Sequence, residues 1–336
     1  MYENSFLHNL YRASTILYMM SSRIHTRRIQ IVGGSTYTVS LPKNWVLFNR
    51  LKKGDIVIIE ELGDNTLLLR LPEPEPMTLG RIKKAQLNLA QGEELGLERM
   101  LVALYSAGYD EIKITQSPII SERLRSKLRS ALSKLSGMEV VEDAADYIVV
   151  QNILDESKLS ISKTLDRMEL LVRSMLRDLE RYSKVSDKEL LASIISRDDE
   201  LDKFYFLLSR QLTLILLGRT SYAKAGIEGS AHVLPLKTYG KALEESGDTL
   251  VSISRRLMER GGVPTKDQLK LMSKAFSSAV KAFRYDDRKA VREVAAIYSS
   301  YFQETYTDPL NLLVGRFLAL CIAMIEAWVD KTALKA

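Results

Sequence analysis

Two pairs of carboxylates, each pair spaced four residues apart, lie in the second half of this sequence. Asp198 and Asp202 lie in Ser196-Arg-Asp-Asp-Glu-Leu-Asp-Lys203, and Glu244 and Asp248 in Leu243-Glu-Glu-Ser-Gly-Asp248. At this spacing the two members of a pair stack on one face of a helix. The first pair interrupts an apolar helical stripe formed by Leu191, Ile194, Ile195, Leu201, Tyr205, Leu208 and Leu212. Burying neighbouring carboxylates is costly, so we expect a positive partner to meet them.

The sequence leaves two interpretations of that partner open. In the first, Arg197, Lys203 or Arg210 neutralises the acids, as salt bridges do on an ordinary acidic surface. In the second, the four carboxylates hold a metal ion. Oxygen ligands without cysteine, and with no histidine beyond His232, favour Mg²⁺, Mn²⁺ or Fe, and Zn²⁺ is also compatible.

A segment near the N-terminus contains basic residues and no acidic ones. Between Ser21 and Lys53 the chain has no Asp or Glu, whereas it has Arg23, Arg27, Arg28, Lys43, Arg50, Lys52 and Lys53. The net charge of the whole chain is only +6, so the clustering of positive charges in this segment is more informative than the net charge. Such a segment is a candidate anion-binding face.

Composition bounds the class of protein. The chain has 336 residues, enough for two or three domains, and its single cysteine, Cys321, lies in an apolar helical pattern and is interpreted as a core residue. One cysteine fits a reducing compartment, so a cytoplasmic location is predicted. No uninterrupted run of 18 apolar residues occurs, which predicts no membrane span. Residues 1–20 are expected to be a disordered extension, with Met19 or Met20 as the true start.

Residues 27–71 have a β pattern. Alternating segments at 28–32 and 37–41 flank Gly33-Gly34, a short helix is predicted from Pro42, and strands are predicted at 56–60 and 66–71. The prolines at 72, 74 and 76 that follow predict a stiff linker.

Residues 77–154 alternate between helix and strand and are predicted to form a small α/β domain. Helices are expected at 93–106 and from Ser117-Pro118 to Leu135, with strands at 111–115, 138–141 and 147–153. No catalytic or ligand motif is visible in this domain. From 157 to 336 the pattern is helical throughout, and its turn signals predict six long helices in two three-helix units.

The segment Ser35-Thr-Tyr-Thr-Val-Ser-Leu-Pro-Lys43, with Trp45-Val46 and Leu51-Lys-Lys-Gly-Asp-Ile-Val57, resembles the AbrB/SpoVT-type swapped-hairpin DNA-binding domain. That resemblance implies a dimer whose basic face contacts double-stranded DNA. Such a short stretch also has too small a core to fold well alone, which independently favours pairing with a copy. The DNA contacts implied are Arg27, Arg28, Lys43, Asn44 and Arg50, with Lys52 and Lys53 as weaker candidates.

The helical part resembles the PhoU family of phosphate-uptake regulators, through Asp198-Asp-Glu-Leu-Asp-Lys-Phe-Tyr-Phe-Leu-Leu-Ser-Arg-Gln211 and Leu243-Glu-Glu-Ser-Gly-Asp248. The resemblance implies two three-helix bundles and a metal ion or small metal cluster at Asp198, Asp202, Glu244 and Asp248. The second unit departs from the motif. Glu293 is followed at i+4 by Ile297, and Glu326/Asp330 is interpreted as a solvated pair, so any metal is placed in the first unit.

The whole chain is therefore predicted to be a multidomain α+β protein with an N-terminal swapped-hairpin domain, a small α/β linker domain and a PhoU-like pair of bundles, an order that resembles regulators found mainly in archaea. The resemblances imply a regulator of phosphate homeostasis that is a homodimer or higher even oligomer and has a phosphate transporter component as a partner. The alternative is a metal-dependent adaptor that does not bind DNA. The chain has no Gly-rich phosphate loop and no catalytic Ser or Cys arrangement, so no enzyme is predicted.

Overall fold

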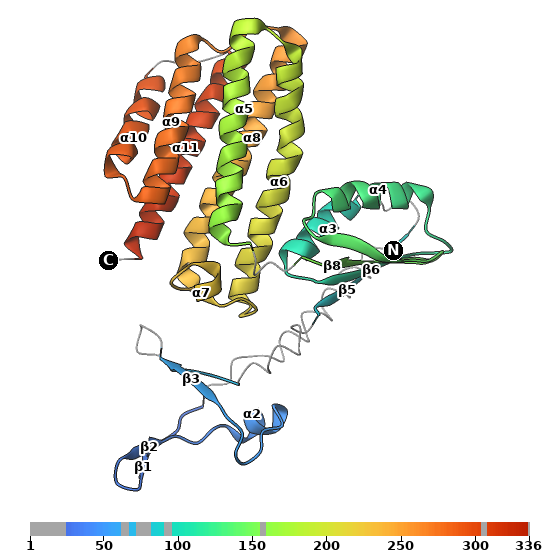
Figure 1. Cartoon of the computed structure of the whole chain (residues 1–336), viewed down its shortest axis with the longest axis vertical. Helices are drawn as coiled ribbons and strands as arrows, with labels where there is room; N and C mark the ends of the chain where they lie inside the picture. The colour runs from blue at the N-terminus through green and yellow to red at the C-terminus, as the bar shows by residue number, and fades with distance from the viewer. Residues whose placement is uncertain are drawn as a thin grey trace, which may run out of the picture. The chain divides into compact units, whose positions relative to one another are not determined.

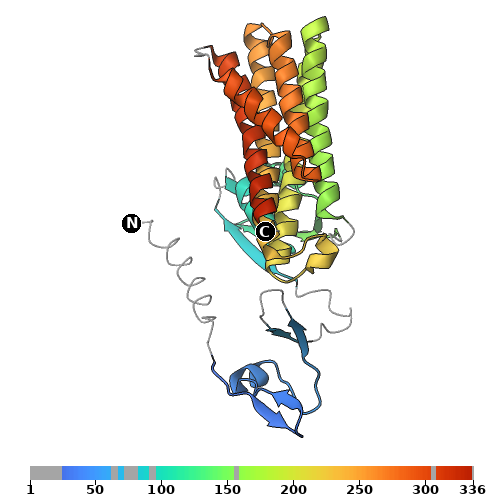
Figure 2. The same cartoon turned by 90° about the vertical axis from the view of Figure 1, so that its left-hand side faces the viewer.

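The structure is a computed structural model that describes residues 25–61, 67–71, 82–90, 96–154, 159–303 and 308–334. The predicted extension at 1–20, the proline linker at 72–76 and the predicted helix start at 93 lie outside these residues. The chain divides into two compact units, residues 1–78 and 79–336. Each unit is described by itself, and Figures 1 and 2 show its elements from two directions.

The first unit consists of two hairpins and a short helix. Its antiparallel pairs are β1 (Gln30–Val32) with β2 (Thr36–Thr38), and β3 (Ile58–Glu61) with β4 (Leu67–Arg70). Helix α2 (Lys43–Phe48) lies between the hairpins. Gly33 and Gly34 have φ angles of 65° and 82°, which glycine adopts without strain at the β1–β2 turn. This order of elements confirms the sequence prediction.

Residues 79–154 form a sheet covered by two helices. The strand order is β5-β6-β8-β7, with β5 and β6 parallel and the other pairs antiparallel. The elements in chain order are β5 (Lys84–Leu89), α3 (Leu97–Ser106), β6 (Glu111–Gln116), α4 (Glu122–Ser133), β7 (Met138–Asp143) and β8 (Tyr147–Asn152). We call this part the middle domain.

Two details of the middle domain differ from the sequence prediction. Strand β5 was not predicted, although its Leu87 and Leu89 are buried. Helix α4 was predicted to begin at Ser117-Pro118 and in fact begins after Ser121, whose side chain accepts a hydrogen bond from the Leu124 N–H. Ser121 supplies the capping oxygen that an N-terminus needs, so the earlier serine was the wrong cap.

Six long helices follow and confirm the predicted number. They run side by side in Figures 1 and 2. Side-chain caps precede five of them, as expected for Ser, Thr or Asp at these positions. The first bundle comprises α5 (Ile161–Val185), α6 (Lys188–Leu216) and α8 (Val233–Arg260), with α7 (Tyr222–Ala225) and the short turn η3 (Ser230–His232) between α6 and α8; the second comprises α9 (Lys266–Tyr285), α10 (Arg288–Tyr301) and α11 (Pro309–Ala333).

The two bundles share one hydrophobic core. Helix α8 packs on α11, and α5 packs on α8 and α9. Where they meet, the rings of Tyr239 and Phe283 stack with centroids 3.7 Å apart. The Tyr239 hydroxyl donates to Glu169 at 2.7 Å, and Arg284 Nε donates to the same carboxylate at 2.6 Å. A buried polar network spanning α5, α8 and α9 therefore fixes the bundles to each other.

Helix α11 is, among the described helices, the one long and apolar enough to cross a membrane by length and composition. Its apolar character has a local explanation. Val314, Phe317, Leu318, Cys321 and Met324 are fully buried in the shared core, and the helix packs on α8, α9 and α10. Burial raises the pKa of the Cys321 thiol far above its ordinary value, as expected for an inert core cysteine.

The middle domain is docked on α6. The fully buried Arg210 side chain of α6 pairs with Asp110 at 2.6 Å and donates to the carbonyls of Tyr105 and Tyr109. Arg219 also pairs with Asp110, at 2.8 Å. The middle domain has its own core, against which Phe206 of α6 packs. The domain predicted as a linker is therefore held against the first bundle by buried charges and apolar contacts.

Candidate functional site

Four carboxylates meet where α6 packs on α8. Asp198 and Asp202 come from α6, and Glu244 and Asp248 come from α8. Leu191, Ile194 and Leu201 around the first pair are fully buried, so the apolar stripe seats this face of α6 against the bundle. The Glu244 side chain is buried, and the other three are half-buried. The structure thus brings together all four residues that the sequence predicted; we call them the carboxylate cluster.

The cluster is electrostatically unfavourable when it is fully ionised. Burial, followed by the nearby charges of Asp202, Asp248 and Glu244, raises the pKa of Asp198 to about 7. Burial and the charges of Glu244 and Asp248 raise the pKa of Asp202 to about 6. Desolvation and like charges both disfavour the ionised form. A proton or a cation at this position would relieve the repulsion.

One oxygen of the cluster lacks a partner. Asp198 Oδ1 is buried and has no hydrogen-bond partner among the described residues. Gly247 of α8 lies opposite: a Cβ there would be 3.2 Å from this oxygen and would collide with Leu201. The glycine therefore lets α8 come close to α6 beside the unpartnered oxygen. Buried carboxylate oxygens normally have a partner, so this one marks a place for a proton or a cation.

The cations around the cluster differ from those the sequence suggested. Arg197 pairs with Asp178 at 2.5 Å, and Arg210 pairs with Asp110. The ammonium that reaches the cluster belongs to Lys241, which lies 2.6 Å from Glu244. The Lys241 contact lessens the rise in the Glu244 pKa that burial causes. Its spacing of three residues before Glu244 on one helix is visible in the sequence and could have revealed it.

A second cation comes from the middle domain. Lys134 lies 2.9 Å from Glu98 and 3.5 Å from Asp199, and its charge partly offsets the raised pKa of Asp202. No sequence pattern could have revealed Lys134, because it joins the site only through the docking of the middle domain on α6. The carboxylate cluster thus lies beside the boundary between the two domains.

The residues of the cluster partly fit a divalent cation. Carboxylate oxygens are the ligands that Mg²⁺, Mn²⁺ and Fe accept, and the unpartnered Asp198 oxygen is free to serve as one. As they stand, no three His, Cys, Asp or Glu side chains among the described residues are arranged to hold an ion. Glu244 is engaged by Lys241, so a bound cation would have to displace that ammonium. His232 lines a different part of the bundle and is not a candidate ligand here.

The second bundle repeats the helix connection of the first but not its acids. Ser186, which ends α5, and Asp286, which ends α9, both have left-handed backbones and stand 100 residues apart, and each is followed by an aspartate that caps the next helix. At the same offset, Asp198 and Asp202 correspond to Tyr298 and Phe302, whose ring centroids lie 4.6 Å apart.

The register corrects the sequence comparison of the two bundles. The sequence comparison treats Glu293 as the equivalent of the first acid of the motif. The offset of 100 residues makes it the equivalent of Ser193 instead. Its carboxylate pairs with Lys274 at 2.7 Å, and that contact, with a hydrogen bond from Ser278, lowers its pKa. Glu326 and Asp330 are exposed, as predicted for a solvated pair. Gly315 faces Phe302 much as Gly247 faces Asp198, so the second bundle has aromatic packing in place of the carboxylates.

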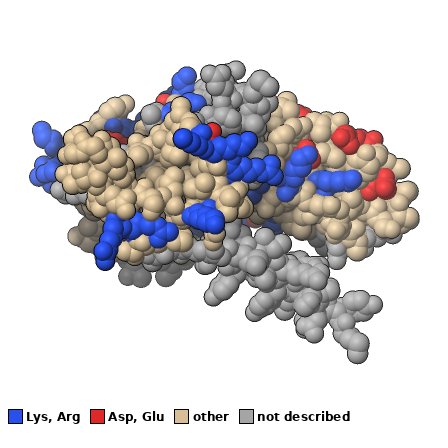
Figure 3. Space-filling view, turned by 90° about the horizontal axis from the view of Figure 1, so that it is seen from below, with Lys and Arg blue, Asp and Glu red and all other residues tan. Residues whose placement is uncertain are grey.

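The basic residues predicted to contact DNA all lie on the first unit and are exposed; they are Arg27, Arg28, Lys43, Asn44, Arg50, Lys52 and Lys53. Lys43 and Asn44 begin α2, and Arg50 follows it with a left-handed backbone, φ 55°. Asp55 accepts a hydrogen bond from the Lys52 N–H at 2.7 Å, which fixes the turn that carries Lys52 and Lys53. On the face shown in Figure 3, Lys and Arg side chains predominate over Asp and Glu.

Two family models match separate parts of the chain. Residues 165–257 match the PhoU domain, and residues 30–76 match the family described as antidote-toxin recognition MazE, bacterial antitoxin. No curated protein matches the chain. The PhoU match runs from α5 through most of α8 and includes the whole carboxylate cluster, whereas the second bundle lies outside it. The MazE match includes Lys43 through Lys53, and Arg27 and Arg28 precede it.

These matches confirm the architecture that the sequence predicted. The chain combines a MazE/AbrB-type segment with a PhoU domain, and both families are regulatory types without catalytic activity. The middle domain and the second bundle are matched by neither family model. The chain thus has the parts of a regulatory protein.

Proposed function

We propose that this protein is a cytoplasmic, DNA-binding regulator of phosphate homeostasis. The observation that carries the proposal is the presence in one chain of a MazE/AbrB-type segment and a PhoU domain. The first unit would bind double-stranded DNA through its exposed basic residues. Long basic side chains chiefly bind phosphates, and a few of them would read base edges.

The first unit would act as a homodimer or within a higher even oligomer. None of its described residues is buried in the single chain. Its large apolar side chains lie open to solvent: Ile29, Ile31, Val32, Tyr37, Val39, Leu47, Phe48, Ile56, Ile59 and Leu67 are all more than half exposed. Apolar surface of this extent in so small a unit needs a cover. A second copy that interleaves its hairpins would supply the missing core.

The carboxylate cluster would hold a divalent metal ion or a small cluster of Mg, Mn, Fe or Zn. Support comes from the unpartnered Asp198 oxygen, from the mutual repulsion of the acids, and from the choice of oxygen ligands. A bound cation would supply positive charge that lets Asp198 and Asp202 ionise together. Lys241 would then release Glu244, and Lys134 would face a less negative surface.

The helical bundles would also dock a partner, and the PhoU resemblance favours a component of a phosphate transporter. Binding at the bundles and binding of DNA would be coupled by a free energy of about 1–3 kcal/mol, the range of ordinary allosteric systems. A metal-dependent adaptor that never binds DNA specifically is the alternative. It would use the first unit for dimerisation alone.

A gel-shift titration tests the proposal. The full chain is titrated onto DNA from upstream of its own coding sequence, against shuffled competitor, at physiological salt, with either Mn²⁺ or a chelator. We expect a specific shift that Lys43→Ala/Arg50→Ala and Arg27→Ala/Arg28→Ala weaken about tenfold or more, because each pair removes phosphate contacts. We further expect the affinity to change with Mn²⁺.

The matched control is Arg288→Ala/Lys289→Ala, which removes two exposed charges from the start of α10. It should leave the shift unchanged. Retention of DNA that is equal for specific and shuffled sequences, and that disappears at physiological salt, would contradict DNA regulation and favour the adaptor.

A further inference from the structure

A cavity of about 440 Å³ opens at one end of the helical domain, away from the carboxylate cluster. It lies among the start of α5, the segment from α7 to η3, the start of α8, and the ends of α9 and α11. Its volume falls within the range of about 300–1,000 Å³ that is typical of sites for small organic ligands. The cavity is formed by both bundles, because α5 and α8 belong to the first and α9 and α11 to the second.

One wall of this cavity is apolar. Ile161 and Leu165 of α5, Leu236 of α8 and Phe283 of α9 all line it. Phe283 is held from behind by its stacking on Tyr239. An aliphatic or aromatic body could therefore be buried here against side chains that are already fixed by packing.

Two cations line the same cavity. Arg284 follows Phe283 on α9, and Lys331 comes from α11, where its ammonium donates to the Phe283 carbonyl. The Arg284 guanidinium also reaches the Ser162 hydroxyl at 3.2 Å. The positive groups and the apolar wall thus meet at Phe283.

The acids that pair with these cations lie outside the cavity. Asp166, which pairs with Arg284, is 61% exposed, and Asp286, which pairs with Lys331, is 43% exposed. Glu169 binds Arg284 from the buried side. None of the three lines the cavity; among the described residues, the carboxylate that lines it is Glu228, whose side chain is 77% exposed. The ion pairs with Asp166 and Asp286 are weak because these carboxylates are exposed, so a ligand anion could replace them. Glu169 stays on Arg284 from the buried side, and Lys331 is therefore the cation that is more available to a ligand.

His232 has a hydrogen-bonding group with no partner. Its Nδ1 is buried and makes no hydrogen bond with the described residues, while its Nε2 lies 3.8 Å from Glu228. The His232 side chain lines the cavity, but the buried Nδ1 does not face it, so the imidazole contributes its other ring atoms to the wall.

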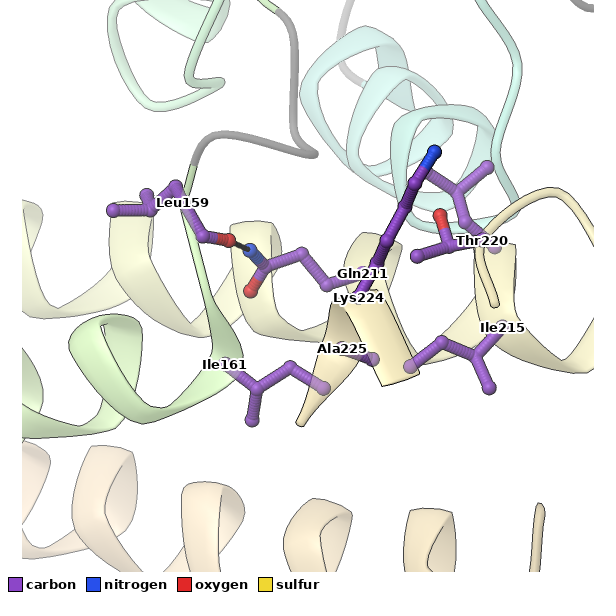
Figure 4. Close-up of a pocket in the computed structure, with 8 residues that line it drawn as sticks. Leu159, Ile161, Gln211, Ile215, Thr220, Lys224 and Ala225 are labelled. Carbon is purple, nitrogen blue, oxygen red and sulfur yellow. Dashed lines mark hydrogen bonds between the residues drawn. The ribbon is translucent and has the colours of Figure 1, made fainter. Parts of the chain in front are cut away.

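A smaller void lies next to the cavity and is shown in Figure 4. Ile161 and Ala225 line both spaces. The void has a volume of about 20 Å³, room for one water molecule, and Gln211 beside it donates to the Leu159 carbonyl. The larger cavity is therefore the one with room for an organic ligand.

We propose that this cavity binds a small amphipathic organic anion. Its acidic group lies beside Lys331 and Arg284, and its body packs on Phe283 and Leu236. The site is independent of the DNA-binding and metal-binding functions proposed above. A ligand held there contacts both bundles and stabilises their packing.

Anilinonaphthalene sulfonate, an aromatic anion that fluoresces in apolar sites, is the probe we would use. In a Trp45→Phe background of the full chain, Trp328 is the remaining tryptophan; it lies on α11 one turn before Lys331. We expect saturable binding of one probe per chain, with energy transfer from Trp328. The neutral analogue N-phenylnaphthylamine should bind about tenfold more weakly, because it lacks the charge.

Two variants test the location with the probe excited directly. Lys331→Gln removes one cation and Leu236→Trp fills the cavity, and each should weaken binding about tenfold or more. Lys270→Gln, an exposed lysine on α9, is the matched control and should leave binding unchanged. Circular dichroism establishes that each variant is folded. The proposal is overturned if the neutral analogue binds equally well, if Leu236→Trp binds normally, or if no saturable site exists.

Discussion

Asp198 shows most clearly what a single residue contributes to this protein. Its carboxylate lies on an otherwise apolar face of α6, and one of its oxygens is buried without a partner. A residue chosen for stability alone would not be an acid here, because burial and four neighbouring acids oppose its ionisation. Residues that carry such a cost are typical of functional sites.

The pH dependence of stability follows from this residue and Asp202. Both carboxyls titrate near 3.8 in the unfolded chain, but their pKa values in the folded protein are about 7 and about 6. Between these limits the folded state binds more protons, so the free energy of unfolding of the metal-free protein falls as pH rises from about 4 to about 7. Relative to Asp198→Asn/Asp202→Asn, the wild type should lose on the order of 3 kcal/mol across this window, since both groups are partly screened by water.

Urea unfolding at a series of pH values measures this loss, with Glu326→Gln/Asp330→Asn as the control, because these two acids have the same spacing on α11 and are exposed. Mn²⁺ added at pH 8 should restore stability to the wild type and not to Asp198→Asn/Asp202→Asn, because a ligand stabilises only the state that binds it. Parallel pH curves for the wild type and Asp198→Asn/Asp202→Asn would show that the cluster is not strained.

At this scale the sequence predicted the acids but not their partners. Spacing within one helix was enough to place Asp198 beside Asp202 and Glu244 beside Asp248. Lys134 joins the site across a domain boundary, which periodicity does not encode. Arg210 was considered as a partner for the acids and instead binds Asp110, because its side chain leaves α6 on the face that contacts the middle domain.

At the scale of elements, helix α6 contacts both the first bundle and the middle domain. Asp198 and Asp202 face α8, while Phe206 and Arg210 face the middle domain. Any shift of α6 caused by a cation at the cluster would therefore also move the middle domain. The docking depends on Arg210, whose side chain is completely buried.

Replacing Arg210 by leucine should loosen this docking. The change leaves Asp110 and the carbonyls of Tyr105 and Tyr109 without their main donor, so we expect a loss of about 3–5 kcal/mol. Hydrogen exchange should speed up in α3 and β6 more than in α9 to α11. Arg219→Gln, which removes a half-buried partner of the same aspartate, should cost less.

A double variant, Arg210→Leu/Asp110→Leu, distinguishes loss of a charge pair from loss of packing. It should recover part of the stability, because neither charge is then left buried alone. Equal exchange rates in wild type and Arg210→Leu would mean that the apolar contacts and Arg219 are enough to hold the middle domain.

The elements themselves were largely predictable, because the helical periods are long and capped. Strand β5 was missed although its polar residues alternate with Ala85, Leu87 and Leu89. That alternation is the pattern of a half-buried strand, so the sequence contained the signal for β5. The start of α4 was misplaced because a Ser-Pro pair, such as Ser117-Pro118, can begin either a turn or a helix. The sequence alone does not distinguish the two.

Among the residues that the structure describes, the first unit has no hydrophobic core and the second unit has two. Residues 79–336 contain the cores of the middle domain and of the bundles, whereas the described residues of the first unit bury nothing. Self-association was predictable from the small size of the β segment. The sequence does not predict which surfaces of two copies meet, because that contact forms between chains.

Deletion of residues 1–78 should therefore give a folded helical protein that has lost its self-association. Light scattering after size exclusion should report an even oligomer for the full chain and a monomer for residues 79–336. Deletion of residues 1–24 is the control and should leave the oligomer intact. An oligomer that persists without residues 1–78 would place the interface on the helical unit.

The repeat of the two bundles shows which side chains the positions of the acids can carry. Equivalent positions of the two bundles are buried: Ile194 corresponds to Val294, and Leu201 to Tyr301. The two bundles therefore pack in a similar way. In the second bundle the equivalent pair of positions carries Tyr298 and Phe302, whose rings contact each other. The same helix connection therefore accepts either a pair of acids or a pair of aromatic rings at these two positions, so replacing Asp198 and Asp202 by apolar side chains is compatible with this fold.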